Sequence, residues 1–145
     1  MSAIPFTDRE LRHAWRELSA AAISVAAGDR RNSHRLLLFY AVECGLKAVW
    51  LRRQNRTLFE SADIEQTGHD LQQILKSLRV GSGLPLPSSF RLSDVVQGKG
   101  SSPRQGKFGD LHQAWRYGGQ SQIPTDQDCE QQLLRVLQWI QGELK

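Results

Sequence analysis

The stretch LLLFYAVECGLKAVWL, residues 36–51, is apolar on nearly every side when it is placed on a helix. A helix of this kind belongs in the middle of a domain, where other elements cover all of its faces. Asn32 or Ser33 can cap its first turn. Glu43 and Lys47 interrupt the run, which is also shorter than the roughly 20 residues that cross a bilayer. We therefore expect a buried central helix and no membrane segment.

Further segments have apolar residues at helical spacing and can pack around this centre. Thr7-Asp8-Arg9-Glu10 has the form of a capping box, and Gly28 favours the end of the helix that starts there. The predicted main helices cover residues 7–28, 32–56, 67–78 and 125–144, with a short helix over 108–117 and a weak helical turn or two over 88–96. No strand is predicted. The expected fold class is all-α, an up-and-down bundle of four main helices with one or two short extra helices.

Length and composition favour a single domain over residues 1–145. A chain of 145 residues, of which 39% are hydrophobic, can bury enough surface for one core. Cys44 and Cys129 are too few and too isolated for a disulfide framework or a zinc motif, and the four histidines are dispersed. We therefore expect no metal and no cofactor, and a cytoplasmic location in which both thiols stay reduced.

Positive charge is concentrated in two places. Residues 30–56 hold seven Arg or Lys, among them Arg52 and Arg53, against the single acid Glu43. Residues 97–107 contain no apolar residue, which predicts a mobile loop. This loop holds three cations, Lys99, Arg104 and Lys107. The order of its glycines and Lys107 does not satisfy a phosphate-binding P-loop. Either region can contact RNA or nucleotide phosphates, or can simply be a solvated surface.

Three short motifs occur in an order that resembles the HEPN superfamily of prokaryotic helical domains. They are Tyr40 to Ala48 in the central helix, Thr67-Gly68-His69-Asp70-Leu71, and Leu111 through Trp115-Arg116-Tyr117-Gly118. The resemblance spans about residues 8–142. It implies either a ribonuclease that pairs an Arg with a His four to six residues later across a dimer interface, or a binding partner that lacks this pair.

Arg116 stands where the resemblance places the arginine, but no histidine follows it at the required distance. Ser121, Gln122 and Ile123 occupy those positions. A general base needs a pKa near the working pH, which an imidazole has and a hydroxyl or carboxamide does not. We therefore expect that the chain is not an enzyme. A ribonuclease with a non-standard site, using His69 or His112 as base beside Arg116, is the alternative.

The expected ligand site is a polar cleft between helices of the bundle. The residues we assign to it are Glu43, Lys47, His69, Arg116 and Tyr117, with Arg116 on a phosphate and Tyr117 stacked on a base. Each has a structural alternative: Glu43 and Lys47 as an ion pair, and His69 with Asp70 as a helix cap. His112 and Arg116 share a helix face. They can bind a phosphate together, or both can be surface residues without a ligand.

The resemblance, with no histidine at the expected distance from Arg116, implies a catalytically degenerate HEPN-like binding domain of a prokaryotic toxin–antitoxin or antiphage system. Its ligand is expected to be a nucleotide, an RNA or a protein such as a nucleotidyltransferase or another defence protein. The resemblance also implies a homodimer. A purely structural subunit of a larger defence complex is a further alternative, in which exposed Trp and Leu side chains dock on the partner.

Overall fold

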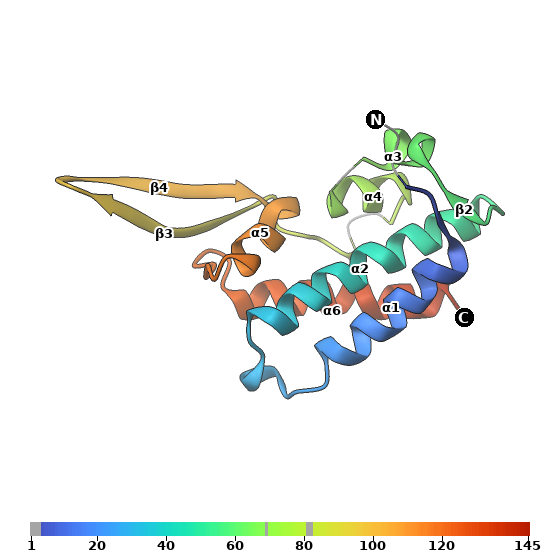
Figure 1. Cartoon of the computed structure of the whole chain (residues 1–145), viewed down its shortest axis with the longest axis horizontal. Coiled ribbons are helices and arrows are strands. Elements are labelled where there is room, and N and C mark those ends of the chain that lie inside the picture. The colour runs from blue at the N-terminus through green and yellow to red at the C-terminus, as the bar shows by residue number, and fades with distance from the viewer. Residues whose placement is uncertain (1–3, 69, 81–82) are drawn as a thin grey trace.

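The computed structural model describes residues 4–68, 70–80 and 83–145, and it is built around the predicted central helix. This helix, α2 (Asn32–Arg53), lies in the middle of the molecule with neighbours on most sides (Figure 1). Leu38, Val42, Leu46 and Val49 are almost fully buried. The cap differs from the prediction: Arg31 is the N-cap residue, and its backbone N–H donates to Nδ1 of His34 at 3.1 Å.

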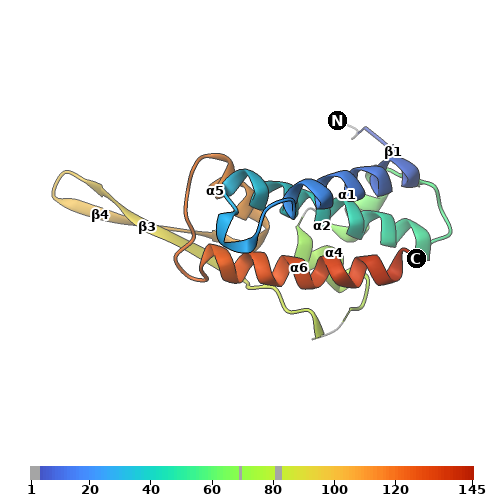
Figure 2. The same cartoon turned by 90° about the horizontal axis from the view of Figure 1, so that it is seen from below.

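Two long helices pack along α2. They are α1 (Asp8–Ala22) and α6 (Asp126–Glu143), and Figure 2 shows them running beside α2. The capping box at the start of α1 is confirmed, since Thr7 and Glu10 bond reciprocally, and Thr125 caps α6 as expected. However, α1 ends six residues before Gly28, and the short 3₁₀ turn η1 (Ala27–Asp29) follows it.

Close packing of the three long helices depends on Gly45 in α2. A Cβ atom at this position would lie 2.8 Å from Cγ2 of Ile140 in α6 and 2.9 Å from Cδ1 of Trp15 in α1. Real Cβ atoms do not approach other side chains so closely. Glycine therefore allows α1 and α6 to approach the same point of α2.

Shorter elements cover the remaining faces of α2. They are α3 (Ser61–Thr67), α4 (Leu71–Ser77), the turn η3 (Phe108–Asp110), α5 (Leu111–Arg116) and a small sheet of β1 (Phe6–Thr7) with β2 (Leu58–Phe59). Asp70 caps α4 by accepting from the backbone N–H of Gln73. Helix α3 falls in a polar stretch that had no apolar periodicity, and the sequence did not predict it.

The predicted helical turns over 88–96 and the predicted mobile loop over 97–107 are both wrong. These residues form an antiparallel hairpin of β3 (Ser89–Gln97) and β4 (Gly100–Lys107), which projects well beyond the helices (Figures 1 and 2). Its strands pair from Ser89 with Lys107 to Gln97 with Gly100, with a bulge between Leu92 and Val95.

A two-residue turn of Gly98 and Lys99 closes this hairpin. Gly98 has a φ of +60°, as the first central residue of a type II′ turn requires. The strand pattern was hidden because β4 has no apolar residue and contains Pro103. Proline is tolerated here because both strands of a two-stranded ribbon are edge strands.

The described part of the chain is therefore mainly helical but not all-α. Three long helices, rather than four, form its centre, and two small antiparallel sheets are added. Within these residues, no helix combines the length and apolar content that crossing a membrane requires.

A buried ionic network fixes the end of the molecule from which the hairpin projects. Nε of Arg35 on α2 lies 2.5 Å from Oε1 of Glu130 on α6, and Glu130 also pairs with Arg30 at 3.4 Å. Oδ1 of Asp126 accepts from the indole N–H of Trp115 at 2.9 Å and from the backbone N–H of Ser121 at 3.0 Å. The network therefore holds α5, the segment after it and the start of α6 against α2.

Candidate functional site

Arg116 ends α5 and lies beside Tyr40 of α2. Its Nη2 donates to the Tyr40 hydroxyl at 2.6 Å. The hydrogen bonds to the hydroxyls of Tyr40 and Tyr117 raise the pKa of Arg116 above its ordinary value. Because the side chain is exposed, the guanidinium stays charged and open to an anionic ligand while the two tyrosines restrain it.

His112 lies one helical turn before Arg116, as the sequence spacing predicted. Its Nδ1 is 2.9 Å from the carbonyl oxygen of Gly109, and its ring centroid is 5.2 Å from that of Phe39 and 6.2 Å from that of Tyr40. A carbonyl can only accept, so Nδ1 carries the proton and Nε2 is left as the acceptor of the neutral ring. The imidazole and the guanidinium thus share Tyr40 as a neighbour.

The hairpin and the side of α5 that carries Gln113 and Tyr117 form a groove. We call it the hairpin groove, and its volume is about 480 Å³. Its lining includes Phe90, Leu92 and Arg104 from the hairpin and Gln113, Tyr117 and Gly119 from α5 and the residues after it. Tyr117 is 79% exposed, whereas Phe90 is buried and adds an apolar surface to the lining. An aromatic ring, a guanidinium and amide groups are therefore presented in one open groove.

The segment that follows Arg116 offers no proton acceptor to this site. The Ser121 hydroxyl donates to the carbonyl of Pro124, and the residue is only 4% exposed. The carbonyl of Ile123 accepts from the N–H of Arg91, which ties the segment to the base of the hairpin. Ser121 therefore has a structural role at the position where the resemblance would place a histidine.

In the described part of the chain, Glu43 forms its ion pair with Lys47 and not with Arg116. Oε1 of Glu43 is 3.7 Å from Nζ of Lys47, and this Nζ lies 5.3 Å from the centre of the Phe59 ring. Tyr40 and Lys47 are seven residues apart on α2, which is about 10 Å along the helix axis. His69, the remaining residue of the expected cleft, lies outside the described residues.

The two predicted groups of cations have different surroundings. Arg53 donates to the carbonyl of Leu78 and lies 2.8 Å from Glu143, so it joins three helices, whereas Arg52 is exposed at the end of α2. Arg104 lines the hairpin groove, Lys99 lies in the hairpin turn and Lys107 lies at its base. Arg104 and Lys99 therefore follow the hairpin from the groove to its outer turn, whereas Lys107 stays near the helices.

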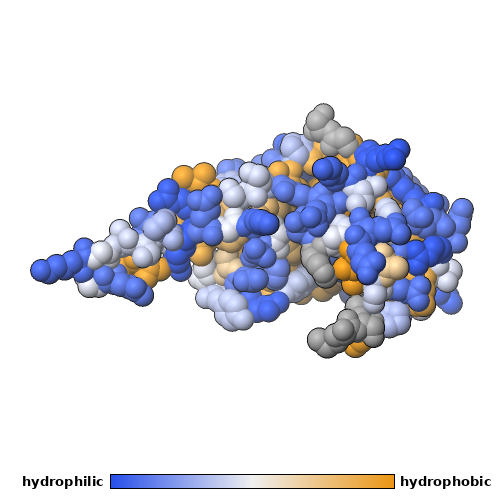
Figure 3. Space-filling model, turned by 90° about the horizontal axis from the view of Figure 1, so that it is seen from above, coloured by the Kyte–Doolittle hydropathy of each residue, from blue (hydrophilic) through white to orange (hydrophobic). Residues whose placement is uncertain are grey.

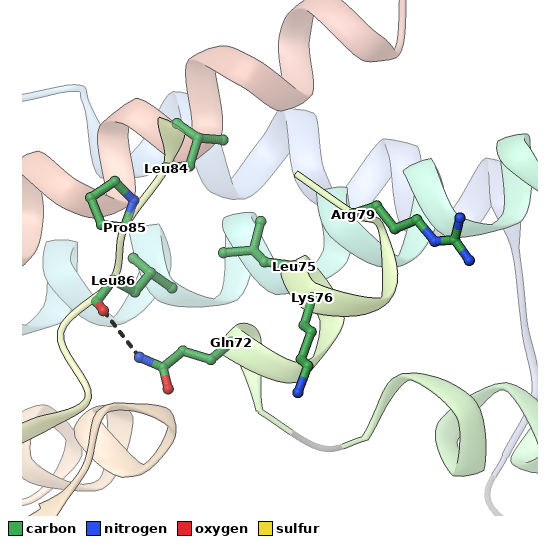
Figure 4. Close-up of a pocket in the computed structure, with 7 residues that line it drawn as sticks. All are labelled: Gln72, Leu75, Lys76, Arg79, Leu84, Pro85 and Leu86. Carbon is green, nitrogen blue, oxygen red and sulfur yellow. Dashed lines mark hydrogen bonds between the residues drawn. The ribbon is translucent and has the colours of Figure 1, made fainter. Parts of the chain in front are cut away.

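A second open pocket lies between α4 and the segment that leads to the hairpin (Figure 4). Leu75, Leu84 and Leu86 form its apolar side, and the Gln72 side chain donates to the carbonyl of Leu86 at 3.1 Å. Figure 4 shows the charged ends of Lys76 and Arg79 pointing away from Leu84 and Leu86. This pocket therefore brings together less polar chemistry than the hairpin groove does.

Neither cysteine is activated as a nucleophile. Burial, followed by the charge of Glu43, raises the pKa of Cys44 to about 11, and burial with the charge of Asp126 raises that of Cys129 to about 12. Both thiols are therefore protonated at neutral pH, when a nucleophile would need to be a thiolate. Among the described residues, no group of His, Cys, Asp and Glu side chains has an arrangement that could hold a metal ion.

The sequence did not indicate Tyr40, Phe90 or Gln113 as part of the site. Tyr40 lies within an apolar run, where a tyrosine is expected to be part of the core. Phe90 and Gln113 belong to the site only because the hairpin forms the groove, and the hairpin was not predicted. Comparisons with family models, curated proteins and solved structures gave no match to this chain.

Proposed function

We propose that this chain is a non-catalytic, HEPN-like domain that binds single-stranded RNA in the hairpin groove. The observation that carries the proposal is the exposed Tyr117 ring in the same groove as Arg104, with the Arg116 guanidinium next to it. Single-stranded nucleic acids are commonly bound by a stack of base on aromatic ring together with cations on the phosphates.

Each residue in the groove, and Arg116 beside it, has a separate part in this binding. Tyr117 provides the face on which an unpaired base stacks, and Gln113 can hydrogen-bond to the edge of that base. Arg104 and Arg116 contact the phosphates on either side of it. Asp110 also lines the groove, and its negative charge repels a phosphate from its surroundings.

Substitution of Tyr117 tests the proposal. Fluorescence anisotropy with a labelled single-stranded RNA should show Kd for Tyr117→Ala raised by about tenfold or more, the loss of one base stack. Arg116→Ala should weaken binding as well, while the melting temperature of both variants stays within a few degrees of wild type because both side chains are exposed. Arg135→Ala, which removes an exposed cation of α6, is the matched control.

Two results would contradict this proposal. One is equal affinity of wild type and Tyr117→Ala for the RNA, which would exclude stacking in the groove. The other is equal weakening by Arg135→Ala, which would mean that any surface cation serves and that binding is not localised.

The ribonuclease remains a second candidate because His112 has the tautomer of a base and shares Tyr40 with Arg116. In that case Nε2 of His112 takes the proton of the attacking 2′-hydroxyl and Arg116 stabilises the charge that develops on the phosphate. Incubation with labelled RNA in EDTA tests it. Cleavage that disappears in both His112→Ala and Arg116→Ala would replace the binding proposal.

The proposal also includes the family, the biological system and the protein partners of the chain. It comprises the HEPN family, a cytoplasmic role in a toxin–antitoxin or antiphage system, a homodimer, and a nucleotidyltransferase or defence protein as partner. The resemblance of the three sequence motifs supports it. Analytical ultracentrifugation tests the dimer. Copurification of a protein encoded beside this chain, in a complex that does not bind RNA, would instead favour the structural-subunit alternative.

A further inference from the structure

The β3–β4 hairpin holds most of the net charge of the chain. Residues 89–107 contain four basic residues, Arg91, Lys99, Arg104 and Lys107, and one acid, Asp94. Their formal charge is +3, whereas the whole chain has +4. The much longer remainder of the chain is thus nearly neutral, and a polyanion that approaches the molecule is drawn to the hairpin.

The shape of the hairpin suits the groove of a duplex. Nine residues of β3 span about 30 Å at the usual rise of a strand. Figures 1 and 2 show this ribbon standing clear of the helices, and Figure 3 shows its outer end as mainly hydrophilic. A two-stranded ribbon without a covering layer is only marginally stable in water, so contact with a partner would also stabilise it.

The side chains of β4 match the chemistry of a double-stranded RNA groove. Ser101, Ser102 and Gln105 are exposed and can exchange hydrogen bonds with 2′-hydroxyls, which line the wide, shallow minor groove of A-form RNA. Arg104 lies opposite Leu92 on the face toward the hairpin groove, whereas alternation along the strand places Lys107 on the other face. A ribbon in a nucleic-acid groove has a phosphate chain on each side, and this hairpin has a cation on each face, with Lys107 at its base.

We propose that the hairpin binds the duplex part of an RNA whose adjoining single strand occupies the hairpin groove. The ligand class is thus an RNA stem with an unpaired tail or loop. The inference rests on the proposed function, because the groove at the base of the hairpin places the unpaired base directly beside the stem. Arg104 lines the groove from within the ribbon and so contacts the junction of the two parts.

Three labelled RNAs separate the two contributions. They are a single strand, a blunt stem of the same length, and a stem that carries the single strand as a tail. In fluorescence anisotropy the tailed stem should bind wild type at least tenfold more tightly than either part alone, since two linked contacts reinforce each other. A DNA version of the tailed stem should bind more weakly because it lacks 2′-hydroxyls.

Substitutions at the outer end of the hairpin test which element meets the stem. Lys99→Ala should weaken binding of the tailed stem and lower the slope of log K against log salt by about one, the effect of one lost phosphate contact. Its affinity for the single strand should not change. Val96→Lys, at a side chain that is 75% exposed, should tighten binding of the stem, and Arg135→Ala should alter neither.

Failure of this inference can be told apart from failure of the proposed function. If the single strand binds through Tyr117 but the stem adds nothing, or if DNA and RNA stems bind equally, only the hairpin inference is overturned. If Tyr117→Ala leaves single-strand binding intact, the proposed function itself fails. A concentration-dependent dimer that Val96→Lys dissolves would also overturn the inference, since the exposed edge would then pair with a second copy of the chain.

Discussion

Arg35 is a mostly buried cation in the network that holds the start of α6 and the segment after α5 against α2. Its guanidinium contacts Glu130 at 2.5 Å and Asp126 at 3.7 Å, donates to Oδ1 of Asn32 at 2.9 Å, and is mostly buried. Asn32 in turn donates to the carbonyl of Gly119 at 2.9 Å, next to the hairpin groove. One buried cation therefore connects the first turn of α2 with the start of α6 and the residues that follow Tyr117.

Arg35→Ala should lower the free energy of unfolding by about 3–5 kcal/mol. The variant removes the shorter of the two ion pairs of the Glu130 carboxylate, which is 2% exposed, and leaves the longer pair with Arg30 at 3.4 Å. Urea unfolding followed by circular dichroism measures the change. Arg135→Ala on the exposed side of α6 should stay within about 0.5 kcal/mol of wild type, and an equally mild effect of Arg35→Ala would show that the network does not contribute to stability.

Asp63 makes the stability of the fold sensitive to acid. Burial on its own would raise the pKa of this carboxyl, but hydrogen bonds from Arg56, the Glu60 N–H and Trp50 outweigh burial and lower it. A pKa below the ordinary 3.8 means that the ionised group stabilises the fold above that pH. The stabilisation is lost as the pH falls through the lowered value.

Asp63→Asn should therefore reduce stability at neutral pH and flatten the loss of stability in acid. Urea unfolding of wild type and variant at neutral pH and again below the ordinary carboxyl pKa measures both effects. If the free energies of unfolding of wild type and Asp63→Asn fall in parallel between these two pH values, the protonation of Asp63 is not coupled to folding.

At the scale of helices, the approach of α1 and α6 to α2 is set by the lack of a side chain at Gly45. Gly45→Ala should destabilise the protein by about 1–3 kcal/mol, because Ile140 and Trp15 must move to admit the methyl group. Alanine has the higher helix propensity, so a variant that is more stable than wild type would show that the two side chains give way easily.

The sequence predicted the elements whose ends carry local signals. Thr7, Asp70 and Thr125 cap their helices as expected, because a capping side chain acts on the backbone within its own turn. The hairpin has no comparable signal, since β4 buries no face and its register comes from the turn at Gly98. Arg116 and His112 were placed on one face by helical spacing, but the groove beside them could not be predicted without the hairpin.

At the scale of the whole molecule, the helical body and the hairpin have separate physical roles. The body buries a continuous core around α2, whereas the hairpin exposes most of its side chains and carries most of the net charge. The hairpin groove lies where the two meet. Binding is therefore expected to leave the core unchanged and to alter only one end of the molecule.

Chemical-shift mapping with a tailed RNA stem tests this account most directly. On titration we expect shifts in the amide signals of Gly106, Gln113 and Gly119 in the hairpin groove, and of Lys99 in the hairpin turn. The signals of Arg16 and Gln141, which line a groove between α1 and α6, should remain in place. Shifts confined to the α1–α6 face, with the hairpin groove unaffected, would contradict it.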